Sequence, residues 1–389
     1  MAQYRYLFAD LLTNNIYAEL PLTGVSFSQE LNTAGAFSGH LMIGDPVLEA
    51  YPIDQATKPS RTALYVERDG TLVWGGVVWS RSYDSDSQTM TITGREFESY
   101  YENRLVLSTS GTYLSIPAGT DLFSAVNTIF YYVQYYYSPN SDIGLQLNYS
   151  AALGQNIPTP GFVVRNNEFR TVMDVVKQLS NMAKSSSSSV GSGFDFNINV
   201  DYDTAGNIVK SLELLQHRGG TWSAGDPNAP MLEFPGNVVS YEWPEDGNSV
   251  ATEVFAVGNS DINYQNYYLS SLTGLDYRNT AQLTDGAPLL QKVNSVQNQE
   301  NPTIVEQLNI AYGLAHAKPV TVATITWDQV SDPQLGFFQT GDEFRIKIDD
   351  VRFPTGLDTV LRLSKFEVSV GEDGPERITA SFVDPLAFT

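Results

Sequence analysis

The chain contains no cysteine. A disulfide framework, a thiolate nucleophile and a cysteine-ligated metal site are therefore excluded. Histidine is also scarce: His40, His217 and His316 lie far apart in the sequence, and none stands in an H-x-x-x-H or E-x-x-H spacing. Because zinc sites and Ser-His-Asp relays both need a histidine with a placed partner, the sequence argues against a histidine-based metal site or catalytic triad.

Long apolar runs are missing as well. No stretch approaches the roughly 18 apolar residues that a membrane span needs. The opening residues, "MAQYRYLFADLL", lack the basic start, the apolar core and the small-residue cleavage site of a secretory signal. We therefore expect neither a membrane span nor Sec export.

Positive charge is scarce, because 22 Lys and Arg stand against 44 Asp and Glu, giving a formal net charge of -22. A surface that holds nucleic acid by neutralising phosphates needs clustered Lys and Arg, so the composition argues against a nucleic-acid-binding protein. The charge does fit a surface that nucleic acid passes without being retained. Acidity that serves only solubility is the alternative.

Residues 1–112 show the alternation of β-strands. The stretch "YVERDGTLVWGGVVWSRSYDSDSQTMTITGRE", residues 65–96, predicts three consecutive strands. Its Asp69-Gly70 pair predicts a hairpin turn that needs positive φ at glycine and joins residues 63–68 to residues 71–83.

The long second strand of this stretch carries Gly75-Gly76, which predicts a bend or bulge where a barrel wall turns a corner. The returning strand alternates, with Met90 and Ile92 on one face. Its other face carries three threonines, Thr89, Thr91 and Thr93. We expect these strands to close a barrel with one core face and one polar face.

Residues 113–230 change to a mixed α/β pattern. "TDLFSAVNTIFYYVQYYY" predicts a helix capped by Thr120, and "TVMD" predicts a second helix whose Thr171 and Asp174 resemble a capping box. The "KSSSSSVGSG" that follows is typical of a flexible connector. "GFDFNINVDYD" and "IVKSLELLQ" predict a hairpin. We expect two helices beside a small hairpin sheet.

Residues 231–389 return to β structure, interrupted by one helix at about 301–317 that starts at Asn301 with Pro302 at its first position. Strands are predicted at "VTVATITW", "DEFRIKI", "TVLRLSKFEVSV" and "ERITASFV".

The last two of these strands match the earlier hairpin. Laid without a gap over residues 359–383, residues 71–95 align strand with strand and place Met90 over Ile378. An internal duplication that yields two barrels predicts such a match. Partial matching of any two hairpins by period alone is the alternative.

No motif for catalysis or cofactor binding is found. The stretch "DYDTAGNIVKSLE" from Asp201 resembles a calcium loop, but Ala205 and Leu212 stand where oxygen ligands are needed, so a turn is predicted instead. Carboxylates are numerous, and residue type alone does not exclude a glycosidase pair, because such a pair is defined by its separation in space. We predict that the chain is not an enzyme and has no catalytic, cofactor-binding or metal-binding residues.

Three stretches resemble the baseplate hub or tail-hub family of long-tailed bacteriophages, whose members are often called minor tail proteins. "LVWGGVVWSRSYDSDSQTMTITGREFESYYENRLV" resembles the family's Trp-x-Gly strand, its returning strand and the step into a short helix. "TVMDVVKQLSN" with "GFDFNINVDYD" resembles the helix leading into the middle-domain sheet. "GNVVSYEWPEDGNSVATEVFAVGN" resembles the return into a second barrel, and "GDEFRIKI" resembles one of its strands.

The resemblance implies a mainly β fold with an α+β insertion, in which two tail-tube-like β-barrels, residues 1–112 and 231–389, flank a mixed α/β domain, residues 113–230. It implies a structural virion protein at the distal end of the tail, assembled in the bacterial host cytoplasm. Three copies are expected to form a homotrimeric ring that joins the tail tube to the tip and surrounds the DNA channel. The expected partners are the distal tail or tube ring and tip or fibre proteins, while tape measure and DNA pass through without specific binding. The family has no catalytic residues to carry over, and no cofactor is implied.

The threonine row formed by Thr89, Thr91 and Thr93 is the candidate wall of that channel, with exposure on the outer surface as the competing interpretation. A second hypothesis for the whole chain is a carbohydrate- or receptor-binding tail protein, which requires an exposed aromatic patch from residues 131–137 and 264–268. A third, a glycoside hydrolase, requires two carboxylates converging in one cleft.

Overall fold

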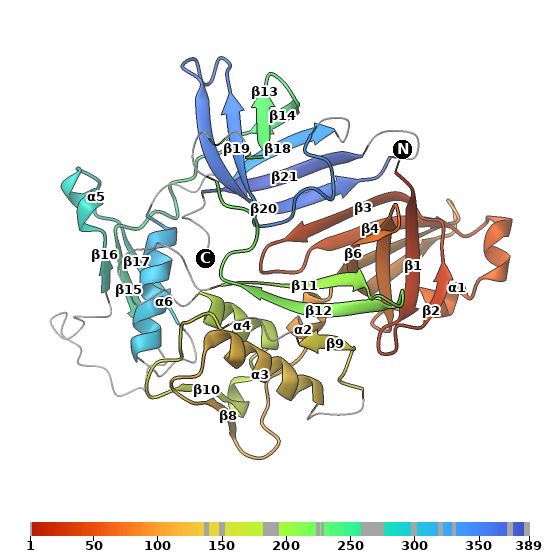
Figure 1. The fold of residues 1–389 in the computed structure, drawn as a ribbon, viewed down its shortest axis with the longest axis horizontal. Helices are drawn as coiled ribbons and strands as arrows, with labels where there is room; N and C mark the ends of the chain where they lie inside the picture. The colour runs from red at the N-terminus through yellow and green to blue at the C-terminus, as the bar shows by residue number, and fades with distance from the viewer. Residues whose placement is uncertain are drawn as a thin grey trace.

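The computed structural model of the chain describes residues 2–135, 140–147, 152–181, 194–222, 226, 229–257, 276–296, 302–317, 322–328, 332–371 and 376–384. Strands account for 44% and helices for 18%, so the prediction of a mainly β chain is confirmed. Figure 1 shows strands from the two ends of the chain side by side, a mixed group below them and a small α/β group to one side.

The N-terminal strands form what we call the first β-half, in the spatial order β3-β4-β7-β6-β5-β1-β2. They are β1 (Tyr4–Asp10), β2 (Ile16–Glu19), β3 (Thr23–Glu30), β4 (Ala36–Met42), β5 (Thr62–Arg68), β6 (Thr71–Asp84) and β7 (Thr89–Glu96), with a short helix α1 (Ile53–Ala56) before β5. At the turn between β5 and β6, Asp69 and Gly70 have φ of 50° and 84°, which confirms the predicted hairpin.

The C-terminal strands form the second β-half, in the order β14-β18-β21-β20-β19-β13. They are β13 (Met231–Phe234), β14 (Val238–Glu242), β18 (Ala323–Asp328), β19 (Glu343–Ile348), β20 (Leu357–Ser369) and β21 (Arg377–Val383). This order repeats β3-β4-β7-β6-β5-β1 strand for strand, which supports the predicted internal duplication. One difference is that β13 runs parallel to β19, whereas β1 runs antiparallel to β5.

A pairing between β3 and β20 joins the two β-halves into a single sheet. Among the described strands, β2, β13 and β14 each pair with one neighbour only, so the described pairings do not close either half into a barrel. The two halves also share one continuous core cluster, which contains Phe8 and Trp74 from the first and Trp327 and Phe366 from the second.

The two long hairpins correspond in register. Thr93 of β7 lies opposite Ser80, and Ser381 of β21 lies opposite Lys365. In both hairpins the register of the ladder shifts on the first strand just before that pair, between Val78 and Ser80 and between Leu363 and Lys365. The returning strands therefore align as the ungapped comparison predicts, with Met90 and Ile378 both in contact with the core cluster. The first strands are displaced by three residues, because the second hairpin has the longer connection.

The glycine pair in β6 serves close packing. The register shifts lie on either side of it, between Val66 and Glu67 and between Val78 and Ser80, so no bulge falls on the glycines, and the alternative of a bend there stays a prediction. A methyl group on Gly76 would lie 2.2 Å from the backbone oxygen of Arg95 on β7. Only glycine allows the two strands to approach this closely.

The middle part contains the two predicted helices and a hairpin. The capping box of Thr171 and Asp174 is confirmed, whereas the first helix is capped by Asp121, whose Oδ1 accepts the Phe123 N–H at 3.0 Å, and not by the predicted Thr120. The Ser-rich connector lies outside the described residues. The elements are α2 (Glu98–Glu102), β8 (Tyr113–Ile116), α3 (Leu122–Tyr135), β9 (Leu145–Leu147), β10 (Phe162–Arg165), α4 (Val172–Ser180), β11 (Asp195–Tyr202) and β12 (Ile208–Leu215).

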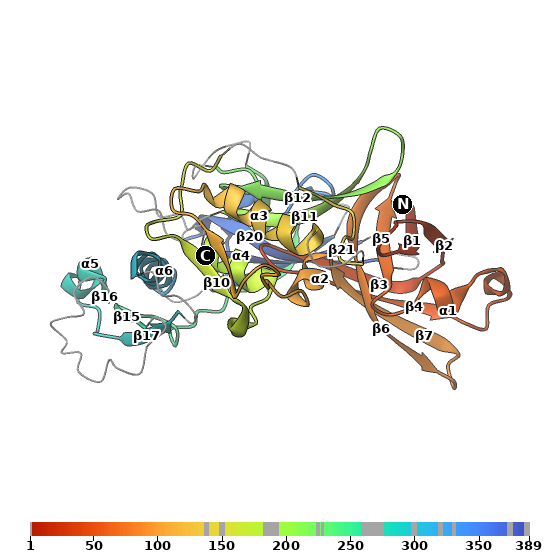
Figure 2. The same cartoon turned by 90° about the horizontal axis from the view of Figure 1, so that it is seen from below.

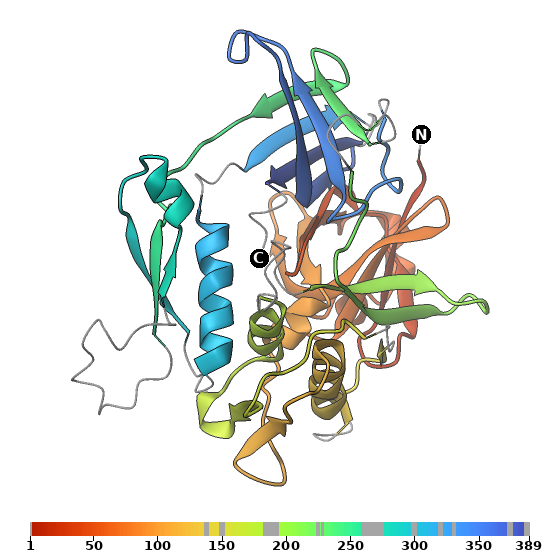
Figure 3. The same ribbon diagram turned by 60° about the vertical axis from the view of Figure 1, so that its left-hand side comes forward.

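A further α/β group interrupts the second β-half between β14 and β18. Strands β16 (Asp276–Arg278), β15 (Glu253–Val257) and β17 (Gln291–Ser295) form a sheet, with α5 (Thr280–Thr284) and the predicted late helix α6 (Pro302–Ala315). Figure 3 shows α6 lying along this sheet. Ile304 and Leu308 of α6 belong to the core cluster of the middle part, so this group packs there and not inside the second β-half. The single helix predicted for residues 231–389 is thus joined by α5.

Replacing Gly76 with Ala is expected to lower the free energy of unfolding by about 1–3 kcal/mol, because the added methyl group overlaps backbone that cannot move without breaking the β6–β7 ladder. Gly111→Ala is the matched control, since its methyl group would meet only the Ser108 hydroxyl at 3.9 Å. Urea unfolding of both variants measures the difference. Equal stability of the two variants would contradict the close-packing role.

Candidate functional site

The threonine row lies on one face of β7, and Met90 and Ile92 lie on the other, as predicted. All three threonines are half-buried. Thr91 Oγ1 lies 3.1 Å from His40 Nδ1 on β4, and Thr93 Oγ1 lies 2.7 Å from Ser80 Oγ on β6. The row is therefore part of a hydroxyl-bearing face that extends across three neighbouring strands.

The second β-half repeats this polar face. Thr379 corresponds to Thr91 in register, and its Oγ1 lies 3.2 Å from Oγ1 of Thr326, the residue of β18 that corresponds to His40. The second row thus has Thr379 and Ser381 at the ladder positions of Thr91 and Thr93, whereas Arg377 stands at the position of Thr89.

The cations near these rows are paired with acids. Arg95 donates to Glu102 at 2.5 Å, Arg81 lies 3.2 Å from Asp54, and Lys365 lies 3.8 Å from Glu30. These three cations therefore do not form an unpaired basic cluster of the kind that would hold phosphates.

A buried carboxylate, Asp195 of β11, joins the three parts of the chain. Its Oδ2 accepts from Arg362 of the second β-half at 2.5 Å and from the Arg218 N–H at 2.7 Å. Its Oδ1 accepts from Asn32 of the first β-half at 3.2 Å. Arg362 also donates to the backbone oxygen of Gly341 at 3.0 Å, so both ions of the pair are satisfied in the interior.

Two more buried acids lie where β7 leads into α2. Glu96 Oε2 accepts the Gly35 N–H at 2.7 Å, and Glu98 Oε1 accepts the Ile198 N–H of β11 at 2.6 Å. Burial raises the pKa of Glu98 to about 7, and burial followed by repulsion from Glu98 raises the pKa of Glu96 well above its usual range. Glu96 thus bonds within the first β-half, and Glu98 bonds α2, which follows directly from β7, to β11 of the hairpin.

Lys210 of β12 is fully buried in the same region. Its Nζ donates to Asn14 Oδ1 at 2.9 Å and to the Leu11 oxygen at 3.3 Å, and it lies 4.9 Å from the centre of the Phe97 ring. Burial lowers its pKa to about 7. Lys210 is therefore a second buried polar contact between the hairpin and the first β-half.

The predicted absence of a histidine site has no counterexample among the described residues. His40 contacts Thr91, His217 Nε2 lies 4.0 Å from Glu343, and His316 stacks on Tyr312 with ring centres 4.0 Å apart. Within the described ranges no group of three or more metal-ligating side chains is found. Across those ranges no helix has the length and apolar character of a membrane span.

The calcium-like loop is a hairpin turn, as predicted. Asp203 Oδ1 accepts the backbone N–H groups of Ala205 and Asn207, both at 2.8 Å, between β11 and β12. Its oxygens therefore stabilise the turn itself.

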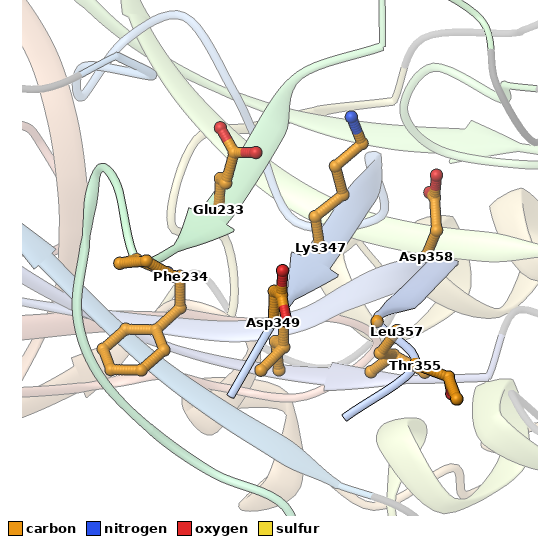
Figure 4. Close-up of a pocket in the computed structure, with 10 residues that line it drawn as sticks. Glu233, Phe234, Lys347, Asp349, Thr355, Leu357 and Asp358 are labelled. Carbon is orange, nitrogen blue, oxygen red and sulfur yellow. The ribbon is translucent and has the colours of Figure 1, made fainter. Parts of the chain in front are cut away.

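An open groove of about 410 Å³ lies at the end of β13, β19 and β20 (Figure 4). Glu233, Lys347 and Asp358 line it, and Asp358 also accepts from Arg345 at 2.6 Å. The acids of this groove include one held in an ion pair, Thr355 is the hydroxyl residue among its lining residues, and no histidine lines it.

The aromatic patch that a glycan-binding protein requires is only partly described. Tyr131 and Tyr135 of α3 are 47% and 54% exposed, with ring centres 4.8 Å apart and planes inclined by 51°. The inclined rings do not form the flat stacking platform of a sugar site. Residues 136, 137 and 264–268 lie outside the described residues.

The sequence interpretation missed the buried charges. Glu96 lies on the same strand face as Ile92, so the period of β7 places an acid on the core face and was an available signal. For Asp195 the alternation in "GFDFNINVDYD" indicated an exposed polar face, whereas residues 195–198 are buried on both faces by distant segments.

Neither a protein-family model nor a curated protein sequence matches the chain. Solved structures do match. The 43 kDa tail protein of prophage MuSo2 from Shewanella oneidensis has a TM-score of 0.58 at 14% identity, over 99% of this chain and 98% of that one. A tail protein from Neisseria meningitidis has a TM-score of 0.57 at 12% identity, over 98% and 96%. Prophage tail protein gp18 from Listeria monocytogenes has a TM-score of 0.56 at 12% identity, over 97% and 94%. The chain therefore has the fold of prophage tail proteins, which confirms the resemblance at the level of the fold.

Asp195→Asn is expected to lower the free energy of unfolding by about 3–5 kcal/mol, because it leaves Arg362 charged and uncompensated in the interior. Asp358→Asn breaks a half-exposed ion pair with Arg345 and is expected to cost about 0–1 kcal/mol. Urea unfolding compares the two variants. A loss at position 195 no greater than at position 358 would contradict the junction role.

Glu98→Gln is expected to remove a pH dependence of stability. The folded state holds the Glu98 proton up to about pH 7, whereas the unfolded chain releases it near pH 4.5. The stability that this proton gives is complete below about pH 4.5 and is lost as the pH rises through about 7. Relative to the variant, the wild type should lose up to about 1.4 kcal/mol per pH unit across that window. Glu49→Gln, at an exposed position, should keep the wild-type profile; parallel profiles for both variants would contradict the assignment.

Proposed function

We propose that this chain is a structural component of a phage-type tail and forms the hub ring at its distal end. The observation that carries the proposal is the repeated strand order of the two β-halves, because one chain then supplies two similar units to a ring. The fold shared with prophage tail proteins supports the assignment to a tail.

Three copies of such a chain place six similar halves around one axis, which lets a threefold ring meet a sixfold tube without a mismatch in the number of units. In this arrangement each β-half is one tube-like barrel unit, and the middle part and the β15–α6 group lie outside the ring. The expected neighbours are the tube or distal tail ring on one side and tip or fibre proteins on the other.

The hydroxyl-bearing faces are the proposed wall of the central channel. In each copy, Thr89, Thr91 and Thr93 would form one row, and the repeated row of the second β-half would form another. Three copies would then supply six rows. These rows carry small neutral hydroxyls except at Arg377 of the second row, and the neighbouring Arg95 and Lys365 lie beside acids, so DNA and tape measure would pass without specific binding. Exposure of the same faces on the outside of the ring is the competing arrangement.

The proposed role requires no catalysis by this chain. The buried acids Asp195, Glu96 and Glu98 are occupied by backbone and arginine donors, and they lie in the interior between parts of the chain. Cleavage of the cell wall, where the particle carries it out, would then be the task of another chain.

Trimer formation is expected to strengthen with ionic strength, because each copy carries a net charge of -22 and the copies repel one another at long range. Light scattering should give three times the mass of one chain, with the trimer fraction at a fixed protein concentration rising between about 50 mM and 500 mM salt.

A chain that stays monomeric over this range would contradict the ring. Cryo-electron microscopy of the trimer tests the channel separately, because the threonine row must face the central hole. A row on the outer surface would remove the channel assignment and leave the ring.

A further inference from the structure

Among the strand edges that have no strand beside them in the described residues are one edge of β6 and one edge of β14. Strand β6 pairs with β5 through residues 71–77 and with β7 through residues 76–84, so the edge of residues 80–84 that faces away from β7 is uncovered. Strand β14 pairs with β18 only. Figure 2 shows the β6–β7 hairpin projecting from the rest of the molecule.

The duplicated partners of these two edges are paired with each other. Strand β20 corresponds to β6, and β3 corresponds to β14, by their places in the two repeated orders. Within the chain, residues 365–369 of β20 pair antiparallel with residues 26–30 of β3. The same kind of edge is thus covered in one half and uncovered in the other.

The registers fix which residues correspond. Tyr83 lies opposite Met90 as Val368 lies opposite Ile378, so Tyr83 corresponds to Val368. On the other edge, Ser26 lies opposite Ser38 of β4, which in turn lies opposite Thr93. Glu242 lies opposite Thr324 of β18, which in turn lies opposite Ser381. Since Thr93 and Ser381 correspond, Ser26 corresponds to Glu242. The residue after each, Phe27 and Trp243, then correspond as well.

We propose that residues 80–84 of one copy pair antiparallel with residues 242–246 of the next copy, that is, with the last residue of β14 and the four residues that follow it, in the register that β20 and β3 use within the chain. Each copy then offers one edge and accepts another, so the contact is head-to-tail and repeats from copy to copy. That three copies close the ring rests on the proposed function, whereas the strand pairing between copies does not.

Burial is the main support for this pairing. Val368 is fully buried and Phe27 is 1% exposed, because they face each other across the β20–β3 ladder. Their counterparts are less covered: Tyr83 is 53% exposed, and Trp243 is half-buried, with its ring centre 5.7 Å from that of Phe353 in its own chain. The proposed register places Tyr83 of one copy opposite Trp243 of the next, an aromatic cross-strand pair that removes both rings from water.

The backbone chemistry of the second edge is compatible with the pairing although it contains Pro244. In the counterpart ladder, Leu31 N–H donates to the Ser364 oxygen, and Val370 N–H donates to the Val25 oxygen. The backbone N–H and C=O groups of the odd-numbered residues of β3 therefore point toward β20. Pro244 corresponds to Ser28, whose N–H faces away from β20. The missing N–H of Pro244 therefore lies on the far side of the proposed contact.

Charge alone does not decide the pairing. The register brings Arg81 opposite Glu245, which is favourable, and Asp84 opposite Glu242, which is not. Arg81 already lies 3.2 Å from Asp54 in its own chain. The aromatic pair and the backbone ladder must therefore supply most of the attraction.

Disulfide trapping in the full-length chain tests the register, and the absence of native cysteine removes background. Two matched variants, Ser80→Cys with Asp246→Cys and Asp84→Cys with Glu242→Cys, place facing Cα atoms at about 4.5–5.5 Å, within reach of a disulfide. Two crossed variants, Ser80→Cys with Glu242→Cys and Asp84→Cys with Asp246→Cys, keep the same substitutions roughly 13 Å out of register.

After mild copper oxidation, the matched variants should link copies into covalent trimers on a non-reducing gel, and the crossed variants should not. A trimer by light scattering in which matched and crossed variants link equally poorly would overturn the strand pairing and leave the ring. Matched links that continue beyond three copies would retain the pairing and overturn the threefold ring. A monomer without links would overturn both.

Tyr83→Glu provides a second readout that needs no cysteine. It should weaken association at least about tenfold, because it places a charge in the proposed aromatic contact. Tyr113→Glu, at a similarly exposed tyrosine of β8, should leave association unchanged. Equal weakening by both variants would assign the effect to net charge and overturn the proposed contact.

Discussion

The ladder between β3 and β20 is the constraint on which the rest of the structure depends. It converts two halves that are far apart in sequence into one sheet with one continuous core cluster. Without it each half would end in an open edge, which in a β protein invites uncontrolled association. The segments between residues 26–30 and 365–369 include the middle part and the β15–α6 group, which lie to the side of this sheet, as Figures 1 and 3 show.

The charged junction beside this ladder fixes orientation at a cost in desolvation. A buried pair such as Asp195 and Arg362 contributes little net stability compared with apolar residues of the same shape, but it tolerates few alternative geometries. Asp195 also accepts a hydrogen bond from Asn32, so one carboxylate contacts all three parts of the chain. Glu98 and Lys210 extend this polar contact along the β11–β12 hairpin. Their raised and lowered pKa values arise from burial between these parts.

Much of the fold follows from local patterns in the sequence. The Asp69-Gly70 turn, the capping box at Thr171 and the alternation of β7 are decided by a few neighbouring residues, and the structure contains each of them. The features that sequence reasoning did not find depend on distant partners. Gly76 is required by the backbone of β7, and Asp195 is buried because two other parts of the chain cover its strand. The threonine row could be predicted as a polar face, but whether that face lines a channel depends on other copies of the chain.

Duplication within one chain changes how a ring of six similar units would assemble. If the proposed pairing holds, every second contact between β-halves in the ring is the β3–β20 ladder within one chain. Because β3 and β20 belong to the same chain, their effective concentration for each other does not depend on the protein concentration. The remaining contacts, between residues 80–84 and 242–246, form only when copies meet. The tethered contact buries Val368 and Phe27 completely, whereas the contact between copies uses Tyr83 and Trp243, which are amphipathic and tolerate water before assembly. Such a division would let the monomer remain folded and separate while the same ladder geometry closes the ring.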